Sequence, residues 1–326
     1  FKKFGFRESY IYLPLGLLLF FDYTRINLEI INPQKHRPNK VVLKNKEYVD
    51  NFKKKDSLVE FLLNDSNKFR IFDILGPQNR WSQFNIENVN GYHPAKLNSY
   101  NKLITMIQKR GYKIWPESIL KQLNVKYLIM PYDNFDYPGF KKIHSGNMFY
   151  FGYDPNYDGK KINSYIYLYE DFYPRFYFTK DIKFLDEKNI FDEILKDHYD
   201  PIQVSYMNVH SQKDLNFKFD ENASIEILSY EPDKIIFKTI ASEKQFLIMS
   251  EIYYENGWIL NSINAEHEIF KVNNFLRGAL IPSGEHTFEM CFKPKDVILG
   301  KYLSLSVFII VIFSFFLIKR KDYDKF

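Results

Sequence analysis

Short runs of alternating hydrophobic and polar residues fill the chain from residue 203 to residue 298. In the last run Phe288 and Met290 point to one side, and Glu289 and Cys291 point to the other. A period of two is typical of strands with one buried face. The region is therefore predicted to form a β-sandwich of about seven strands, with Cys291 as a passive thiol away from the main core. The runs are SIEILSY, KIIFKTI, KQFLIMSEIYY, GWILNSI, HEIFKVN, LRGALIP and HTFEMCFK.

Residues 24–202 carry a different pattern, in which strand and helix periods are mixed. KFRIFDIL and VKYLIMP alternate as strands do, and two helices are predicted between them, at 94–110 and 116–124. Two further strand patterns, YIYLYED and RFYFTKDIKF, precede a helical pattern that Pro201 is expected to end. This order predicts a small α/β layer before the sandwich, and an α+β fold for the chain as a whole.

The helix predicted at 94–110 has a recognisable entrance. A turn at Gly91 precedes it, and Pro94 suits a first helical position, where the missing N–H costs nothing. Its apolar residues then recur at helical spacing. These signals leave Tyr92 and His93 at the mouth of the helix without a structural explanation.

The segment 303–318 is strongly apolar, with thirteen hydrophobic residues and three serines. At roughly −0.3 to −0.6 kcal/mol for each apolar residue near the centre of a bilayer, insertion gains about 4 to 8 kcal/mol. As a helix the segment rises only about 24 Å, so residues 299–302 must help to cross a hydrocarbon core of roughly 30 Å. A transmembrane helix is therefore predicted at 299–318.

Basic residues beside the apolar ends predict the topology. A Lys-Arg-Lys cluster follows the C-terminal span, and the positive-inside rule places residues 319–326 in the cytoplasm. At the other end, the shorter apolar stretch YIYLPLGLLLFF follows the basic, cytoplasmic segment 1–8. It predicts the last turns of a second membrane helix, at 9–23, in a chain cut from a longer one. Residues 24–298 are then extracytoplasmic.

Composition narrows the classes of function. The net charge of +5 is small for 326 residues and is dispersed, whereas nucleic-acid-binding proteins usually carry a dense basic face. A single cysteine excludes an internal disulfide framework and Cys-rich zinc sites. The histidines form no ligand-spaced pair, and no phosphate-binding loop or nucleophile elbow occurs. The sequence thus predicts no nucleic-acid partner and no metal site in this chain.

Several segments together carry a resemblance to a known family. They are FRIFDIL, NVNGYHPAKLNSYNKLI, LNVKYLIMP, YPRFYF and SEIYYENGWILNSINAEHEIFKVNNFLRGALIPSGEHTFEMCFKPKDVILG. In this order, with an apolar segment on each side, they resemble the bacterial YfhO-type membrane proteins. The likeness covers most of the chain, from about Asp22 to the final span.

The resemblance implies a multi-pass protein of the bacterial cell membrane, with many spans ahead of an extracytoplasmic C-terminal region. Such proteins are similar to glycosyltransferases that use a polyprenyl-phosphate-linked sugar, in some members to decorate an envelope polymer such as lipoteichoic acid. It also implies that the catalytic carboxylate, with any divalent metal, lies upstream of Phe1. This chain alone would then be non-catalytic and hold no cofactor. The alternatives are a non-catalytic envelope module whose sandwich binds glycan or a partner protein, and an accessory domain of a transporter or flippase.

Tyr92, His93 and Lys96 form the first candidate site. The resemblance makes the NGYH stretch a family hallmark, and these side chains are predicted to face a membrane-side cleft and contact the acceptor or a lipid phosphate. A His at a helix N-terminus can donate to phosphate, and a Lys adds a point charge. Alternatively, Tyr92 packs under the helix while His93 caps it.

Trp258 and Arg277 are the remaining candidates. Trp258 opens a strand and is a candidate platform for stacking a glycan, although a Trp at such a position is more often part of a sandwich core. Arg277 is a further phosphate-binding candidate, but it could instead pair with Glu251 or Glu255 across the sheet. The sequence leaves both alternatives open.

Overall fold

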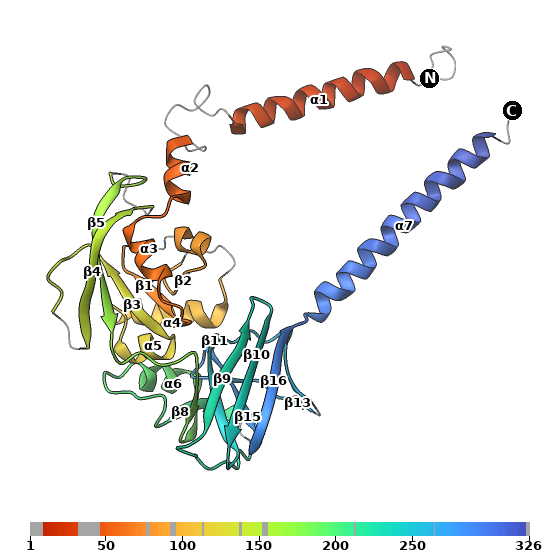
Figure 1. Cartoon of the computed structure of the whole chain (residues 1–326). Coiled ribbons are helices and arrows are strands. Elements are labelled where there is room, and N and C mark those ends of the chain that lie inside the picture. The colour runs from red at the N-terminus through yellow and green to blue at the C-terminus, as the bar shows by residue number, and fades with distance from the viewer. Residues whose placement is uncertain are drawn as a thin grey trace.

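The chain has a mixed α+β fold built from three sheets, which confirms the predicted fold class at this level (Figure 1). The structure is a computed structural model. It describes residues 9–31, 46–75, 79–91, 96–112, 114–136, 139–151, 156–211, 213–263 and 265–323.

A mixed sheet of five strands forms the first layer. Its strand order is β2-β1-β3-β5-β4, in which β1 runs parallel to β2 and β3, and β5 runs antiparallel to β3 and β4. The strands β1 and β3 lie within segments that the sequence predicts as strands, whereas β5 overlaps the predicted segment YIYLYED but begins four residues before it. The bounds are β1 (Arg70–Asp73), β2 (Glu87–Asn88), β3 (Val125–Met130), β4 (Phe140–Phe149) and β5 (Lys161–Tyr169).

Helices cover both faces of the mixed sheet. On one face α3 packs Leu58 and Leu62 against Ile71 of β1, beside Trp81 of the 3₁₀ helix η3. Asp56 caps α3 and also pairs with the buried Arg80 at 2.7 Å. On the other face lie α4 and α5, and α6 packs beside these two helices and against β8 (Ser205–Asn208) of a second, six-stranded sheet. The bounds are α2 (Lys46–Lys53), α3 (Ser57–Leu63), η3 (Asn79–Phe84), α4 (Asn98–Lys109), α5 (Glu117–Gln122), α6 (Glu187–Ile194) and η4 (Val209–Ser211).

Two further sheets pack face to face, in agreement with the predicted alternation. The six-stranded sheet has the order β6-β11-β15-β14-β8-β7, and the outer sheet has the order β13-β12-β16-β10-β9. Phe237, Met249 and Phe288 lie in the core between them. The bounds are β6 (Phe176–Thr179), β7 (Ile182–Leu185), β8 (Ser205–Asn208), β9 (Ser224–Tyr230), β10 (Lys234–Ala241), β11 (Gln245–Ile252), β12 (Trp258–Ser262), β13 (Glu266–His267), β14 (Phe270–Val272), β15 (Leu276–Ile281) and β16 (Gly284–Phe292).

The largest hydrophobic core joins the two halves of the chain. It contains Phe72 and Leu128 of the mixed sheet, Leu103 of α4, and Phe246 and Ile248 of β11. The six-stranded sheet also takes strands from both sides of residue 203, because β6 and β7 precede that position and β11 follows it. The α/β layer and the sandwich therefore pack against each other through a shared core and are not separate domains joined by a linker.

Two predicted helices differ in their bounds. The helix expected at 94–110 begins at Asn98, because Leu97 has an extended backbone (φ −63°, ψ 127°). The helix expected to run to Pro201 ends at Ile194, and Leu195 leaves the helical region (φ −93°, ψ 6°). Pro201 lies within a later turn, where Asp200 Oδ1 accepts from the backbone N–H of Ile202 at 2.8 Å. A Pro in the sequence thus marks a nearby boundary rather than the boundary itself.

Two long helices project from the layered body on the same side of it (Figure 1). They are α1 (Ser9–Ile31) and α7 (Lys295–Tyr323). Within the part of the chain that the structure describes, one helix is long and apolar enough to cross a membrane, α7 over Lys295–Ser314, and none of that stretch is buried. The apolar side chains of α1 from Tyr12 to Leu28 are also mostly exposed.

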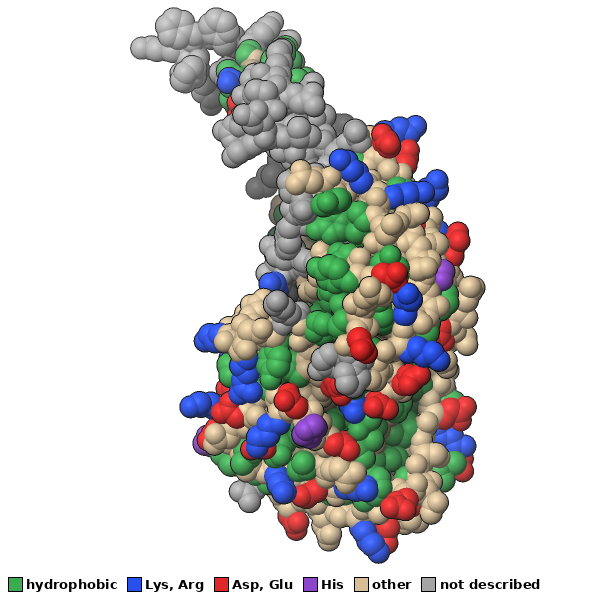
Figure 2. Space-filling view, turned by 90° about the vertical axis from the view of Figure 1, so that its left-hand side faces the viewer, with side chains coloured by type: hydrophobic (Ala, Val, Ile, Leu, Met, Phe, Trp, Pro, Cys, Tyr) green, Lys and Arg blue, Asp and Glu red, His purple; other side chains and the backbone are tan. Residues whose placement is uncertain are grey.

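Figure 2 shows the face of the molecule on the β4–β5 side. Apolar side chains form a central band on this face. Acidic and basic side chains are interspersed over the lower part and along one edge. Positive and negative side chains are thus intermixed on this face, as the dispersed charges of the sequence indicate.

Candidate functional site

A cleft of about 1080 Å³ lies where the α/β layer meets the sandwich. One wall is formed by η3, the edge strand β2 and the first half of α4. The other wall is formed by the β9–β10 turn and by β11 and β12. Its lining is rich in aromatic rings and in side-chain amides and hydroxyls, namely Trp81, Tyr100, Tyr230, Trp258, Asn79, Asn85, Asn88, Asn101 and Ser82.

The charged residues of the lining balance each other. Lys68, Arg70 and Lys96 supply three positive charges, and Glu87, Glu231 and Glu251 supply three negative charges. A cleft with this balance is suited to a neutral polar ligand rather than to a polyanion.

Arg70 ties the two walls together at the base of the cleft. Its Nε donates to Glu87 at 3.0 Å, and its Nη2 donates to Glu251 at 3.2 Å. Nη1 donates to the carbonyl oxygens of Leu123 and Ser250, at 3.1 and 2.5 Å. Arg70 belongs to the mixed sheet, whereas Ser250 and Glu251 belong to the six-stranded sheet. This one side chain therefore joins the two layers.

Arg175 also joins the two layers, but it belongs to the sandwich side and reaches toward the mixed sheet. It stands just before β6 of the six-stranded sheet and donates from Nη2 to Glu87 of the mixed sheet at 2.9 Å. Its guanidinium also lies 5.2 Å from the ring centroid of Tyr230, whose hydroxyl donates to Glu251 at 2.5 Å. Two buried arginines, the largely buried Glu251 and the half-buried Glu87 thus form one ionic network across the junction.

The network shifts the pKa values of its members. Burial alone would raise the pKa of Glu87, but the positive charges of Arg70 and Arg175 outweigh it, and the pKa is lowered. Burial, with the nearby Glu251 carboxylate, raises the pKa of Tyr230. Glu87 is therefore held as a carboxylate and Tyr230 as a neutral phenol. This suits binding and positioning better than proton transfer, which needs a pKa near the working pH.

Trp258 sits at the other end of the cleft. Arg277 stacks on its ring at 4.0 Å, and the ring of Phe292 lies 5.3 Å away. Trp258 packs partly against the sandwich core while also lining the cleft. It pairs with Phe292 across β12 and β16, only three residues before α7 begins at Lys295. The cleft therefore opens close to the base of α7.

Arg277 does not form the ion pair that the sequence suggested as one alternative. Among the described residues it forms no ion pair with Glu251 or Glu255, and its Nε donates instead to the carbonyl oxygen of Ile252 at 3.2 Å. Glu251 instead pairs with Arg70 and Arg175. Burial lowers the pKa of Arg277 to about 10, against the opposing effect of Glu251. Arg277 thus supports Trp258 from behind rather than bridging the sheet.

Some of the site residues predicted from the sequence lie at this cleft. Lys96 lines the α4 wall and Trp258 the sandwich wall, and Arg277 lies directly behind Trp258. Tyr92 and His93 fall outside the described residues, between Gly91 and Lys96, which both line the cleft.

The sequence reasoning missed the roles of Arg70, Glu87, Arg175 and Glu251 at this site, and it named Glu251 only as a potential partner of Arg277. A signal for two of them was present, because Arg70 interrupts the apolar run FRIF and Glu251 ends the apolar run FLIMSE. A charged residue inside a buried strand needs a partner, but the sequence does not say which one. Glu87 lies 17 residues from Arg70, and Glu251 lies 181 residues from it.

Within the described residues no group of three or more His, Cys, Asp or Glu side chains is arranged to hold a metal ion. What the cleft offers chemically is a set of aromatic faces, amides and paired charges for binding a polar ligand. Comparison of the chain with protein-family models, with curated proteins and with solved structures found no match.

Proposed function

We propose that this chain is the membrane-anchored, extracytoplasmic part of a bacterial envelope protein, and that its cleft binds a saccharide. The observation that carries the proposal is the lining of the cleft. Three half-buried aromatic rings (Tyr100, Tyr230 and Trp258), several amides and balanced charges surround about 1080 Å³. This volume is slightly above the range of roughly 300–1,000 Å³ that is usual for small-molecule sites, so it accommodates more than one sugar unit.

The position of the cleft supports a ligand that is held near a membrane. Trp258 pairs with Phe292, which lies three residues before the start of α7, the apolar helix proposed to span the bilayer. A saccharide in the cleft would thus lie close to the lipid surface. This is where an envelope polymer and a polyprenyl-phosphate-linked sugar would meet, in a multi-pass parent of the YfhO type.

The role proposed for this chain is to hold the acceptor, with the chemistry of sugar transfer carried out upstream of Phe1. Glu87 and Glu251 line the cleft, but both are engaged by arginine. Glycosyl chemistry commonly needs a carboxyl group that can take up or release a proton. For Glu87, burial would raise the pKa, but the charges of Arg70 and Arg175 outweigh burial and lower it. The cleft therefore fits acceptor binding better than bond breaking.

Titration calorimetry tests this function. The full chain in non-ionic detergent would be titrated with oligosaccharide fragments of envelope glycopolymers. We expect saturable binding that Trp258→Ala and Lys96→Ala each weaken by about tenfold, which corresponds to about 1.4 kcal/mol. Lys141→Ala, an exposed lysine of β4 outside the cleft, serves as the control and should bind as the wild type does. Equal binding by all four proteins would contradict the proposal.

A further inference from the structure

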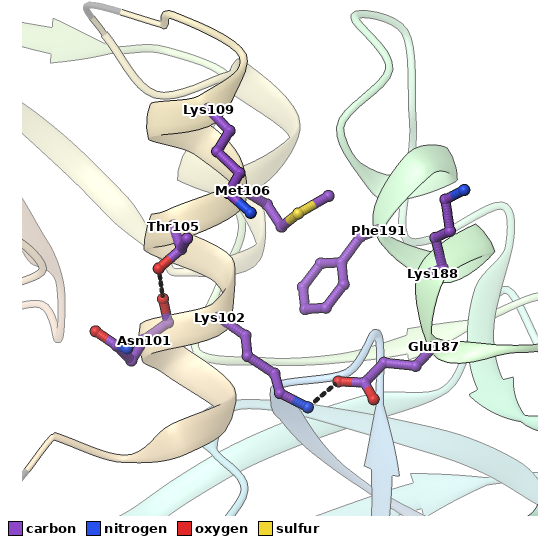
Figure 3. Close-up of a pocket in the computed structure, with 8 residues that line it drawn as sticks. All are labelled: Asn101, Lys102, Thr105, Met106, Lys109, Glu187, Lys188 and Phe191. Carbon is purple, nitrogen blue, oxygen red and sulfur yellow. Dashed lines mark hydrogen bonds and ion pairs between the residues drawn. The ribbon is translucent and has the colours of Figure 1, made fainter.

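A separate groove of about 390 Å³ lies between α4 and α6 (Figure 3). Apart from Asn101, its lining is not shared with the cleft. The residues of α4 recur three or four positions apart and so occupy one face of that helix. The lining consists of Asn101, Lys102, Thr105, Met106 and Lys109 from α4, and Glu187, Lys188 and Phe191 from α6.

The groove has an apolar floor. Met106 and Phe191 extend toward each other from the two helices (Figure 3). Phe191 is buried and Met106 is half-buried, so part of this floor remains accessible. The hydroxyl of Thr105 donates to the carbonyl oxygen of Asn101 at 2.8 Å, so its proton is already used. The floor is suited to one large apolar side chain as an anchor.

Two ion pairs fix the spacing of the helices. Lys102 of α4 pairs with Glu187 of α6 at 2.6 Å, and Arg110 at the end of α4 pairs with Asp192 of α6 at 2.5 Å. The groove is therefore preformed, and a ligand would not have to separate the helices.

The rim of the groove is positively charged. Three lysines and one glutamate line it, and the glutamate is taken by Lys102. Within the described part of the chain neither Lys109 nor Lys188 forms an ion pair. A complementary occupant must therefore carry carboxylates beside its apolar group.

The chain's own segment 32–45 does not meet this requirement. It contains four Lys or Arg residues and one His, and it contains no Asp or Glu. Like charge would repel it from the rim. The occupant must come from a different source.

From these features we infer that the α4–α6 groove binds an acidic amphipathic segment of another protein. The segment places a large apolar residue on Met106 and Phe191 and directs carboxylates toward Lys109 and Lys188. This is the helix-in-groove mode, in which apolar anchors give affinity and flanking charges give orientation. Because α4 also lines the cleft, the partner would dock on a neighbouring face of the same helix, with Asn101 between the two sites.

Fluorescence anisotropy tests this inference. The full chain in non-ionic detergent would be mixed with a labelled peptide of about 14 residues in which Leu and Glu recur at helical spacing. We expect saturable binding that weakens with salt and that Lys109→Glu/Lys188→Glu weakens by about tenfold or more. The matched control Lys141→Glu/Lys183→Glu changes the charge equally at exposed positions outside the groove and should leave binding unchanged.

Three results would overturn the inference. One is binding that the groove substitutions leave unchanged. A second is equal binding of the same peptide with Lys in place of Glu. The third is a different occupant of the groove. In that case the peptide fails to bind, and the groove substitutions abolish either binding of the fatty-acid anion decanoate or association of the chain with itself. The exposed position of both lysines makes misfolding of the double variant unexpected, and a thermal melt checks it.

Discussion

At the scale of single residues, the junction depends on charges that have been taken out of water. Arg70 and Arg175 are almost completely buried, and each makes a hydrogen bond to Glu87. A buried ion pair gains little over an apolar replacement, but the loss of one partner leaves an uncompensated charge. The network is therefore better understood as fixing the relative position of the two layers than as a large source of stability.

Glu251→Ala tests the network. Arg70 and Arg175 would then share Glu87 alone, and we expect the free energy of unfolding to fall by about 3–5 kcal/mol. Glu285→Ala is the control, because Glu285 pairs with Lys238 at the surface and its loss should cost no more than about 1 kcal/mol. Denaturant titration measures both. Equal losses in the two variants would show that the network does not bind the layers as described.

Asp73 gives the stability a pH dependence. It is fully buried, and this raises its pKa to about 7, although Trp81 and the amide of Leu75 donate to it at 2.7 and 2.9 Å. An unfolded Asp titrates near pH 3.9. Between about pH 4 and 7 the native state therefore binds more protons than the unfolded state, and the free energy of unfolding falls as pH rises.

The expected fall over this interval is up to about 4 kcal/mol. Urea titrations at a series of pH values measure it. Asp73→Asn should flatten the profile between about pH 4 and 7, whereas Asp214→Asn, at an exposed position, should leave it unchanged. A profile for Asp73→Asn with the slope of the wild type would contradict this role of Asp73.

At the scale of elements, strand periodicity predicted much of the fold. The alternation of β16 places Phe288 and Met290 in the sandwich core and Cys291 outside it, as expected, although Cys291 is buried rather than open to solvent. β4 was not predicted, because Lys141, Lys142 and Gly146 break its apolar pattern at an edge of the mixed sheet. Local alternation detects a strand with one buried face but not a polar edge strand.

Strand pairing was harder to foresee than strand position. β6 and β7 read as strands in the sequence, but β6 pairs with β11 about seventy residues later, with Phe178 opposite Leu247. Nothing in a local pattern specifies such a partner. The cleft depends on the same long-range packing, because its two walls come from distant parts of the chain. Lys96 and Trp258 were candidates from the sequence, whereas Arg70, Glu87 and the assembly of the two walls were not foreseen.

Gly257→Ala tests how β12 meets the start of α7. Gly257 has φ +113°, and an added Cβ would lie 2.8 Å from the ring of Phe292 and 3.0 Å from Pro294. We expect a loss of about 1–3 kcal/mol in stability from backbone strain and crowding. Gly300→Ala on α7 is the control, because nothing lies within 4 Å of its added Cβ. A thermal melt of Gly257→Ala that matches the control would contradict this account.

At the scale of the whole molecule, the apolar helix α7 and the basic residues that follow its apolar stretch are the basis of the proposed topology. The body between α1 and α7 would lie outside the cell, and residues 319–326 would lie in the cytoplasm. A membrane-impermeant maleimide applied to intact cells should then label Lys141→Cys on β4. It should label a Cys added after Phe326 only once the cells are permeabilised. Labelling of both sites only after permeabilisation would contradict the extracytoplasmic placement.

Photo-crosslinking of an envelope oligosaccharide to the full chain in membranes tests the central claim most directly. Peptide mapping would then locate the crosslinks. The saccharide-binding cleft predicts crosslinked peptides from residues 79–101 and 230–258, which supply most of its two walls. Crosslinks confined to the exposed face of the outer sheet would place glycan binding on the sandwich instead, and they would contradict the cleft as the functional site.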